Sequence, residues 1–219
     1  MTKNKIAAWN VIDCCNLKCR FCFGPAIGEL IKLSTNQAKQ KISQFAKDGY
    51  KTLILTGGEP LLRTDIIELI KYAKLKRLKT ILHTNGFLVT AKFIEGITNY
   101  LDQINLPLDG NNAKSNDAIR TKGHFNKIIL LLQQLKNKDI KIIISTVVFQ
   151  KNIKIIKQIG DLLPRWIYKW RVFQVRGRDA NMAIADERFN KLILAGYAFK
   201  VQKVRRGDKK FDKSYEFVS

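Results

Sequence analysis

All four cysteines of this 219-residue chain lie in one short stretch, DCCNLKCRFCFG, at residues 13–24. The start of the sequence has no recognisable signal peptide, so we expect a cytoplasmic chain whose thiols stay reduced. In such a chain a tight cluster of cysteines indicates a metal site rather than a set of disulfide bonds. The spacing of the cysteines then decides which metal or cluster they suit.

A structural zinc site is the first of three arrangements that the cysteines allow. Such a site needs four protein ligands, usually in two pairs that lie well apart in the sequence. Cys14 and Cys15 are neighbours and project in different directions, and neither histidine, His83 or His124, lies near them in the sequence. The pattern therefore does not favour zinc.

The other two arrangements are iron–sulfur sites. Cys14, Cys19 and Cys22 have the C-x4-C-x2-C spacing of a plant-type ferredoxin, but that pattern requires a distant fourth cysteine, which the sequence lacks. Cys15, Cys19 and Cys22 form a C-x3-C-x2-C triad. Three thiolates can hold a [4Fe-4S] cluster and leave one iron without a protein ligand, which is the kind of open position that catalysis needs. This interpretation leaves Cys14 as a spare.

A second motif, TLILTGGEPLL, contains Gly57, Gly58, Glu59 and Pro60 directly after a short apolar run. Glycines let a backbone approach a ligand closely, and the Glu59 carboxylate offers acceptors for an ammonium group. Both this motif and the cysteine stretch follow apolar runs that predict strands. They therefore lie at the carboxyl ends of strands, where parallel α/β folds build their active sites.

Together, CNLKCRFCF and GGEP resemble the motifs of the radical S-adenosylmethionine (SAM) superfamily, including the aromatic Phe21 before the last cysteine. The resemblance implies that Cys15, Cys19 and Cys22 hold a [4Fe-4S] cluster whose open iron binds the amino and carboxylate groups of SAM. In that family the reduced cluster cleaves SAM to methionine and a 5′-deoxyadenosyl radical, which abstracts hydrogen from a substrate. The resemblance also implies that the GGEP segment holds the amino group of SAM.

Other strand ends supply further candidates for binding SAM. Thr84 and Asn85, in LHTNG, resemble the corresponding turn of the family. We expect Asp109 to accept a ribose hydroxyl group and Arg120 to pair with the carboxylate of SAM, as a bidentate guanidinium allows. Thr146, at the end of the fifth apolar run, is expected to meet the adenosine.

Six apolar runs alternate with amphipathic stretches along the chain. The runs, apolar nearly throughout as buried parallel strands are, span residues 6–12, 51–56, 79–84, 101–108, 141–149 and 169–175. The stretches that predict helices span residues 34–50, 64–76, 90–100, 124–138 and 153–163. Periodicity alone allows either a barrel or an open sheet for this α/β order. The resemblance implies a partial (β/α)6 TIM-type barrel of parallel strands, splayed open at one side for a substrate.

We expect one radical SAM core domain over residues 5–178. A helix at 185–201 and a short basic tail are expected to follow, with no separate domain within 179–219. Pro107 lies inside the fourth apolar run, where it removes a hydrogen-bond donor, and therefore predicts a bulge or a local break.

The charge of the chain is strongly positive, with 40 Lys and Arg residues against 18 Asp and Glu residues and a net charge of +22. Such a chain attracts polyanions, including nucleic acid and phosphorylated substrates. The basic residues are scattered, and only residues 200–213 are dense enough to suggest a dedicated basic patch. Nucleic-acid binding is therefore possible but not favoured. No apolar run approaches the length of a membrane span, so no membrane partner is expected.

The segment at residues 165–189 bears on the substrate. Its Arg176 and Arg178 are candidates for binding a phosphate or carboxylate group, and the segment is similar to one in viperin-like enzymes, which implies dehydration of a nucleoside triphosphate. LPLDG (106–110) and IRTKGHF (119–125) instead resemble peptide- or cofactor-modifying radical SAM enzymes. A non-catalytic core that binds only SAM or a cluster is a further alternative. For an enzyme, the resemblance implies a flavodoxin- or ferredoxin-like reducing partner and a small-molecule, nucleotide or peptide substrate.

Overall fold

The computed structural model describes residues 5–19, 21–22, 33–175, 182–208 and 216–218. Their strands form one curved sheet in the order β7-β6-β5-β4-β3-β2-β1-β8, and every neighbouring pair is parallel. The strands are β1 (Lys5–Ile12), β2 (Tyr50–Gly57), β3 (Lys79–His83), β4 (Gln103–Pro107), β5 (Lys141–Val148), β6 (Lys169–Gln174), β7 (Lys200–Val204) and β8 (Glu216–Val218). The predicted partial barrel is confirmed, with one additional strand at each edge.

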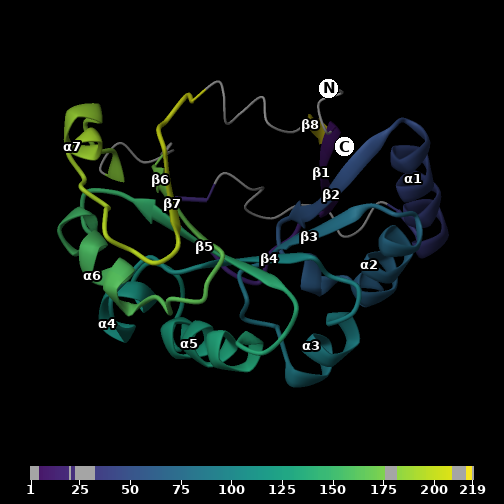
Figure 1. The fold of residues 1–219 in the computed structure, drawn as a ribbon, viewed down its shortest axis with the longest axis horizontal. Helices are drawn as coiled ribbons and strands as arrows, with labels where there is room; N and C mark the ends of the chain where they lie inside the picture. The colour runs from purple at the N-terminus through teal and green to yellow at the C-terminus, as the bar shows by residue number, and fades with distance from the viewer. Residues whose placement is uncertain (1–4, 20, 23–32, 176–181, 209–215, 219) are drawn as a thin grey trace.

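Helices connect the strands and lie along the outer, convex side of the curved sheet (Figure 1). They are α1 (Thr35–Lys47), α2 (Ile66–Leu75), α3 (Ala91–Ile97), α4 (Ala113–Asp117), α5 (His124–Leu135), α6 (Ile156–Leu162) and α7 (Asp186–Asn190), with short 3-10 turns η1 (Pro60–Leu62) and η2 (Ile153–Ile155). The first helix begins where its sequence predicts, because Ser34 and Gln37 form a reciprocal capping box. Within the described residues, the helices are too short and too polar for one of them to cross a membrane.

The two faces of the sheet differ in chemistry. Leu53, Leu55 and Trp170 on the convex face belong to the buried apolar core. Alternate residues such as Thr52 and Arg171 line a cavity on the concave face instead, as the period of two in a strand requires. The strands are therefore less uniformly apolar than the sequence suggested, and the polar side chains gather on the inner face of the partial barrel.

The predicted helix at 185–201 is wrong over most of its length. α7 ends at Asn190, and Lys200–Val204 form strand β7, which pairs with β6. Gly196 has a φ angle of +86°, a backbone conformation that an α-helix does not admit. Pairing with the exposed edge of β6 therefore outweighs the helical pattern of this segment.

The bulge or local break predicted at Pro107 is also wrong. Pro107 is the last residue of β4, and the registers of β4 with β3 and β5 show no shift. Asn105 accepts a hydrogen bond from the Thr84 N–H group on the β3 side, whereas the Leu108 N–H group donates to Ser145 on the β5 side. The backbone nitrogen of Pro107 thus faces β3, but it lies beyond the last residue of β4 that pairs with β3. No N–H donor is needed there, so proline fits.

Candidate active site

Three of the four cysteines line one cavity of about 210 Å3 at the carboxyl ends of the strands. These are Cys15, Cys19 and Cys22, the C-x3-C-x2-C triad. Cys14 is half-buried, packs against the apolar core and is absent from the lining of this cavity. The fold therefore groups Cys15, Cys19 and Cys22 together and sets Cys14 apart, as their spacing in the sequence does.

The GGEP segment holds the cysteine stretch in place through its main chain. The Gly58 N–H group donates to Ile12 O and the Glu59 N–H group donates to Cys14 O, both at 2.8 Å. A Cβ atom at Gly57, whose φ is +132°, would lie 2.2 Å from Ile12 O, and one at Gly58 would lie 1.9 Å from Cys14 O. The absence of side chains at the two glycines thus lets the main chain of the cysteine stretch pack directly against them. This role is additional to the expected close approach of a ligand.

Replacing Gly58 with alanine should displace the cysteine stretch, because the new methyl group overlaps main-chain atoms that a side-chain rotation cannot relieve. We expect iron incorporation to fall several-fold and the midpoint of thermal unfolding to drop. Gly96→Ala in α3 is the matched control, since its Cβ meets only the flexible end of Ile67 at 3.1 Å and alanine is the better helix former. Equal iron content in the two purified variants would contradict this role for Gly58.

Glu59 joins the end of β2 to the end of β3. Its carboxylate is fully buried and accepts hydrogen bonds from Leu61 N at 3.0 Å, Thr84 Oγ1 at 2.7 Å and Asn85 N at 2.7 Å. Burial raises the pKa of Glu59, although the three donors favour its charged form. Glu59 therefore fixes the Thr84–Asn85 turn, a role that the sequence does not reveal, while Pro60 begins the 3-10 turn η1 beside it.

Asn85 reaches from this turn to the first cysteine of the triad. Its Nδ2 atom donates to Asn16 Oδ1 at 2.8 Å and lies 3.7 Å from Cys15 Sγ. His124, buried at the start of α5, contacts the main chain of Asn85, with its Nε2 atom 2.9 Å from Asn85 O. Because a carbonyl oxygen only accepts, His124 carries its proton on Nε2 and accepts from Asn116 at Nδ1.

Arg120 reaches the second cysteine. Its Nε atom pairs with Asp109 Oδ2 at 2.6 Å, its Nη1 atom lies 3.7 Å from Cys19 Sγ, and the guanidinium stacks 4.7 Å above the Phe21 ring. Burial disfavours the charged guanidinium, but the negative charge of Asp109, together with the hydrogen bonds to Asp109 and Cys19, outweighs this effect and raises the pKa of Arg120. The side chain stays a cation at the wall of the cavity.

Two more predicted SAM contacts, besides Glu59, have other roles in the structure. Asp109 is fully buried, and its Oδ1 atom accepts from Val147 N at 2.7 Å while Oδ2 binds Arg120. Thr146 donates to Leu108 O at 2.6 Å and accepts from Trp170 Nε1 at 2.8 Å on the convex side of β5. Neither side chain lines the cysteine cavity, so their placement does not support contacts with ribose or adenosine.

The donor set of the cavity fits an iron–sulfur cluster. The described residues contain no three His, Cys, Asp or Glu side chains arranged to hold a single metal ion. The thiolates of an iron–sulfur cluster bind separate irons, so they lie around a cavity rather than at one point. Burial raises the pKa values of Cys15 and Cys19, and these thiols therefore keep their protons until a metal displaces them.

Sequence reasoning missed several residues at this site, and Arg63 and His83 are two of them. Arg63, fully buried beside Asp65, donates to Val11 O and Leu33 O and so ties together the main chain on either side of the cysteine stretch. His83, the last residue of β3, lines the cysteine cavity although it is far from the cysteines in sequence. The predicted substrate residues Arg176 and Arg178 lie outside the described residues.

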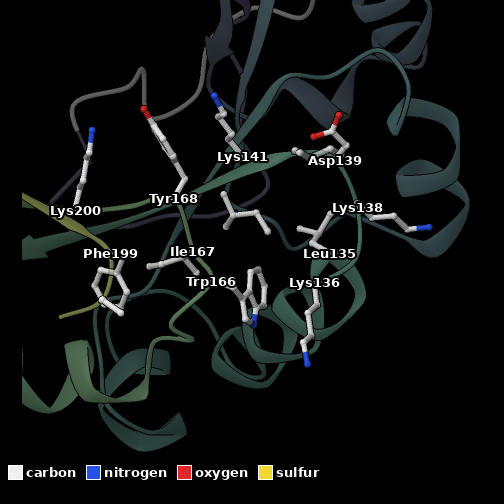
Figure 2. Close-up of a pocket in the computed structure, with 13 residues that line it drawn as sticks. Leu135, Lys136, Lys138, Asp139, Lys141, Trp166, Ile167, Tyr168, Phe199 and Lys200 are labelled. Carbon is white, nitrogen blue, oxygen red and sulfur yellow. The ribbon is translucent and has the colours of Figure 1, made fainter.

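A separate groove of about 460 Å3 lies at the opposite ends of the strands (Figure 2). Trp166, Ile167 and Phe199 form its apolar part, with Lys141 and Lys200 beside them. Both lysines are the first residues of their strands, whereas the thiols lie at the carboxyl ends. This groove is therefore remote from the cysteine cavity.

Several known proteins resemble this chain in sequence or in fold. The chain is 32% identical over 186 residues to an AdoMet-dependent heme synthase of Nitratidesulfovibrio vulgaris, covering 82% of this chain and 51% of that protein. It is 30% identical over 199 residues to an S-adenosylmethionine-dependent nucleotide dehydratase of Flammeovirga pacifica, covering 82% and 68%. The crystal structure of Streptococcus suis SuiB bound to S-adenosylmethionine shares the fold, with a TM-score of 0.72, 19% identity and coverage of 94% and 51%.

The chain thus spans about half the length of the first of these curated relatives. Residues 9–163, which contain both motifs and most of the sheet, match the family model of the Radical SAM superfamily. That family uses a [4Fe-4S] cluster and SAM. With this match, and with the triad of thiols gathered beside the GGEP segment, the chain belongs to the radical SAM superfamily.

Proposed function

We propose that this chain acts as a radical SAM enzyme, with Cys15, Cys19 and Cys22 as the ligands of a [4Fe-4S] cluster. The observation that carries the proposal is the convergence of these three thiols, without Cys14, on a single cavity. When bound and reduced, the cluster and SAM together supply a 5′-deoxyadenosyl radical that takes a hydrogen atom from the substrate.

The residues around the thiols supply polar groups for the amino acid part of SAM. Gly58, Thr84, Asn85 and Arg120 line the same cavity as the cysteines. Arg120 has five N–H donors, and its hydrogen bonds to Asp109 and Cys19 use two of them. The remaining donors suit a carboxylate, and the Glu59 carboxylate stiffens the turn that carries Asn85.

An electron donor is also part of the proposal, because the radical forms only after one-electron reduction. Cys22 is exposed, unlike the other two cysteines of the triad. A flavodoxin- or ferredoxin-like protein that docks near Cys22 therefore has the shortest path to the cluster.

The direct test is anaerobic reconstitution of the purified chain with iron and sulfide. We expect about four irons per chain and a change in the EPR spectrum of the reduced protein when SAM is added. Dithionite should then release 5′-deoxyadenosine and methionine in equal amounts. A chain that takes up four irons yet never cleaves SAM would support the non-catalytic alternative instead.

Nucleoside triphosphate dehydration is a second, narrower candidate function. The observation that favours it is coverage, since the chain spans 68% of the nucleotide dehydratase but 51% of the heme synthase. Each of the four ribonucleoside triphosphates should be incubated with the reconstituted protein, SAM and dithionite. Stimulation of 5′-deoxyadenosine release by one of them would support the candidate, and no stimulation by any of them would exclude it.

A further inference from the structure

The concave face of the sheet encloses a second cavity of about 720 Å3, a volume typical of small-molecule sites. Its walls are the inward-facing side chains of neighbouring strands, from Thr52 of β2 to Gln202 of β7. His83, Asn105 and Ser145 line both this cavity and the cysteine cavity. The two spaces therefore meet at the carboxyl ends of β3, β4 and β5, next to the thiols.

Positive charge dominates the lining of this larger cavity. Among the described residues that line it, Lys79, Lys169 and Arg171 are basic, whereas Asp208 is acidic. Burial, and next the charge of Arg171, lower the pKa of Lys169, with Lys200 and Lys79 contributing in the same direction. These cations therefore repel one another inside the barrel, and an anion placed among them would relieve that repulsion.

His83 stands where the two cavities meet. Its Nε2 atom is buried and has no hydrogen-bond partner among the described residues. Burial and the nearby charge of Arg171 lower the pKa of His83 from 6.5 to about 3, so the imidazole is neutral at physiological pH. A buried ring nitrogen of this kind normally has a partner, and a group of a bound molecule in the cavity can supply it.

We propose that the barrel cavity is the substrate site and that it takes a small molecule carrying several anionic groups, phosphates or carboxylates. The anionic groups lie against Lys169 and Arg171, and a polar group of the same molecule hydrogen-bonds to His83 Nε2. This arrangement directs the uncharged part of the molecule toward the cysteine cavity. The inference rests on the proposed function, because it names the substrate class of the same site.

Calorimetric titration of the reconstituted protein with inorganic tripolyphosphate, without reductant, tests the charge of the site. We expect one molecule to bind per chain and Lys169→Gln or Arg171→Gln to weaken binding about tenfold, as loss of a charged hydrogen bond does. Arg165→Gln is the matched control, since this exposed side chain lies outside the cavity and loses the same charge. Weakening of the same size in Arg165→Gln would show binding by net charge alone and overturn the proposal.

Parallel titrations distinguish the two sources of negative charge. CTP represents the phosphates and citrate the carboxylates, each compared between the wild type and the Lys169→Gln variant. The compound that binds the wild type more tightly than it binds the Lys169→Gln variant identifies the kind of anionic group that the site takes. Binding of neither compound nor of tripolyphosphate overturns the proposal.

His83 provides an independent readout with the compound that binds. His83→Leu should weaken binding several-fold, while His83→Gln, which keeps a nitrogen at a similar position, should restore most of it. If His83→Leu and His83→Gln bind the compound equally well, His83 does not contact it. Since no reductant is present, these titrations succeed or fail independently of SAM cleavage, whose absence in the wild type would instead contradict the proposed function.

Discussion

Alanine at Cys15, Cys19 or Cys22 should abolish SAM cleavage, whereas alanine at Cys14 should leave it nearly intact. Each triad thiol lines the cysteine cavity, and the Cys14 side chain does not. Loss of a residue that merely orients a metal ligand costs 10–100-fold, so loss of a ligand should lower the rate by more than about 100-fold. The measurements are iron per chain after anaerobic reconstitution and 5′-deoxyadenosine released under dithionite.

Cys14→Ala is a close control because it removes a thiol from the same stretch without disturbing its main chain. The hydrogen bond that Cys14 O accepts from Glu59 N survives the substitution. A Cys19→Ala protein that still cleaves SAM would disprove the assignment of the triad. Loss of the cluster from Cys14→Ala would show instead that the C-x4-C-x2-C set provides the ligands.

The order of strands and helices was predictable because each βα unit carries its own local signals. The apolar runs matched β1 to β6 within a few residues, and the Ser34 capping signal placed the start of α1. Parallel strands bring their carboxyl ends to one edge, so the meeting of the cysteine stretch with GGEP followed from strand order alone.

The misses come from contacts between segments far apart in the sequence. β7 forms because β6 offers an unpaired edge, which no local pattern in residues 200–204 signals. Thr146 turned away from the cavity because its neighbours Ser145 and Val147 occupy the concave side of β5. His83 looked like part of an apolar strand, and its place between the two cavities depends on the curvature of the whole sheet.

The pair of Asp109 and Arg120 shows the same limitation at the site itself. Both residues were predicted to contact SAM directly, and their contact with each other, at exposed side-chain fractions of 0% and 12%, was not predicted. Asp109 follows β4 and Arg120 follows α4. The two residues are 11 positions apart in the sequence, and only the fold brings them together as an ion pair. The carboxylate positions the guanidinium, and the guanidinium faces Cys19 and the cavity.

Asp109→Asn should therefore be one of the most destabilising single substitutions in the chain. The variant leaves the Arg120 cation buried without its carboxylate, and breaking a buried ion pair in this way costs about 3 kcal/mol or more. Urea unfolding of the iron-free, reduced chain measures the change in the free energy of unfolding. Because Arg120 also loses its aim at Cys19, we expect the reconstituted variant to bind SAM more weakly than the wild type.

Two further variants show how much of the stability loss comes from leaving a buried charge unpaired, rather than from losing any ion pair. Lys74→Gln breaks the pair between Lys74 and Asp102, whose side chains are 40% and 28% exposed, and should cost less than about 1 kcal/mol. Combining Asp109→Asn with Arg120→Gln removes both buried charges, so the double variant should lose less stability than the two single losses add up to. If Lys74→Gln and Asp109→Asn lower the free energy of unfolding equally, the buried pair does not hold the wall of the cavity.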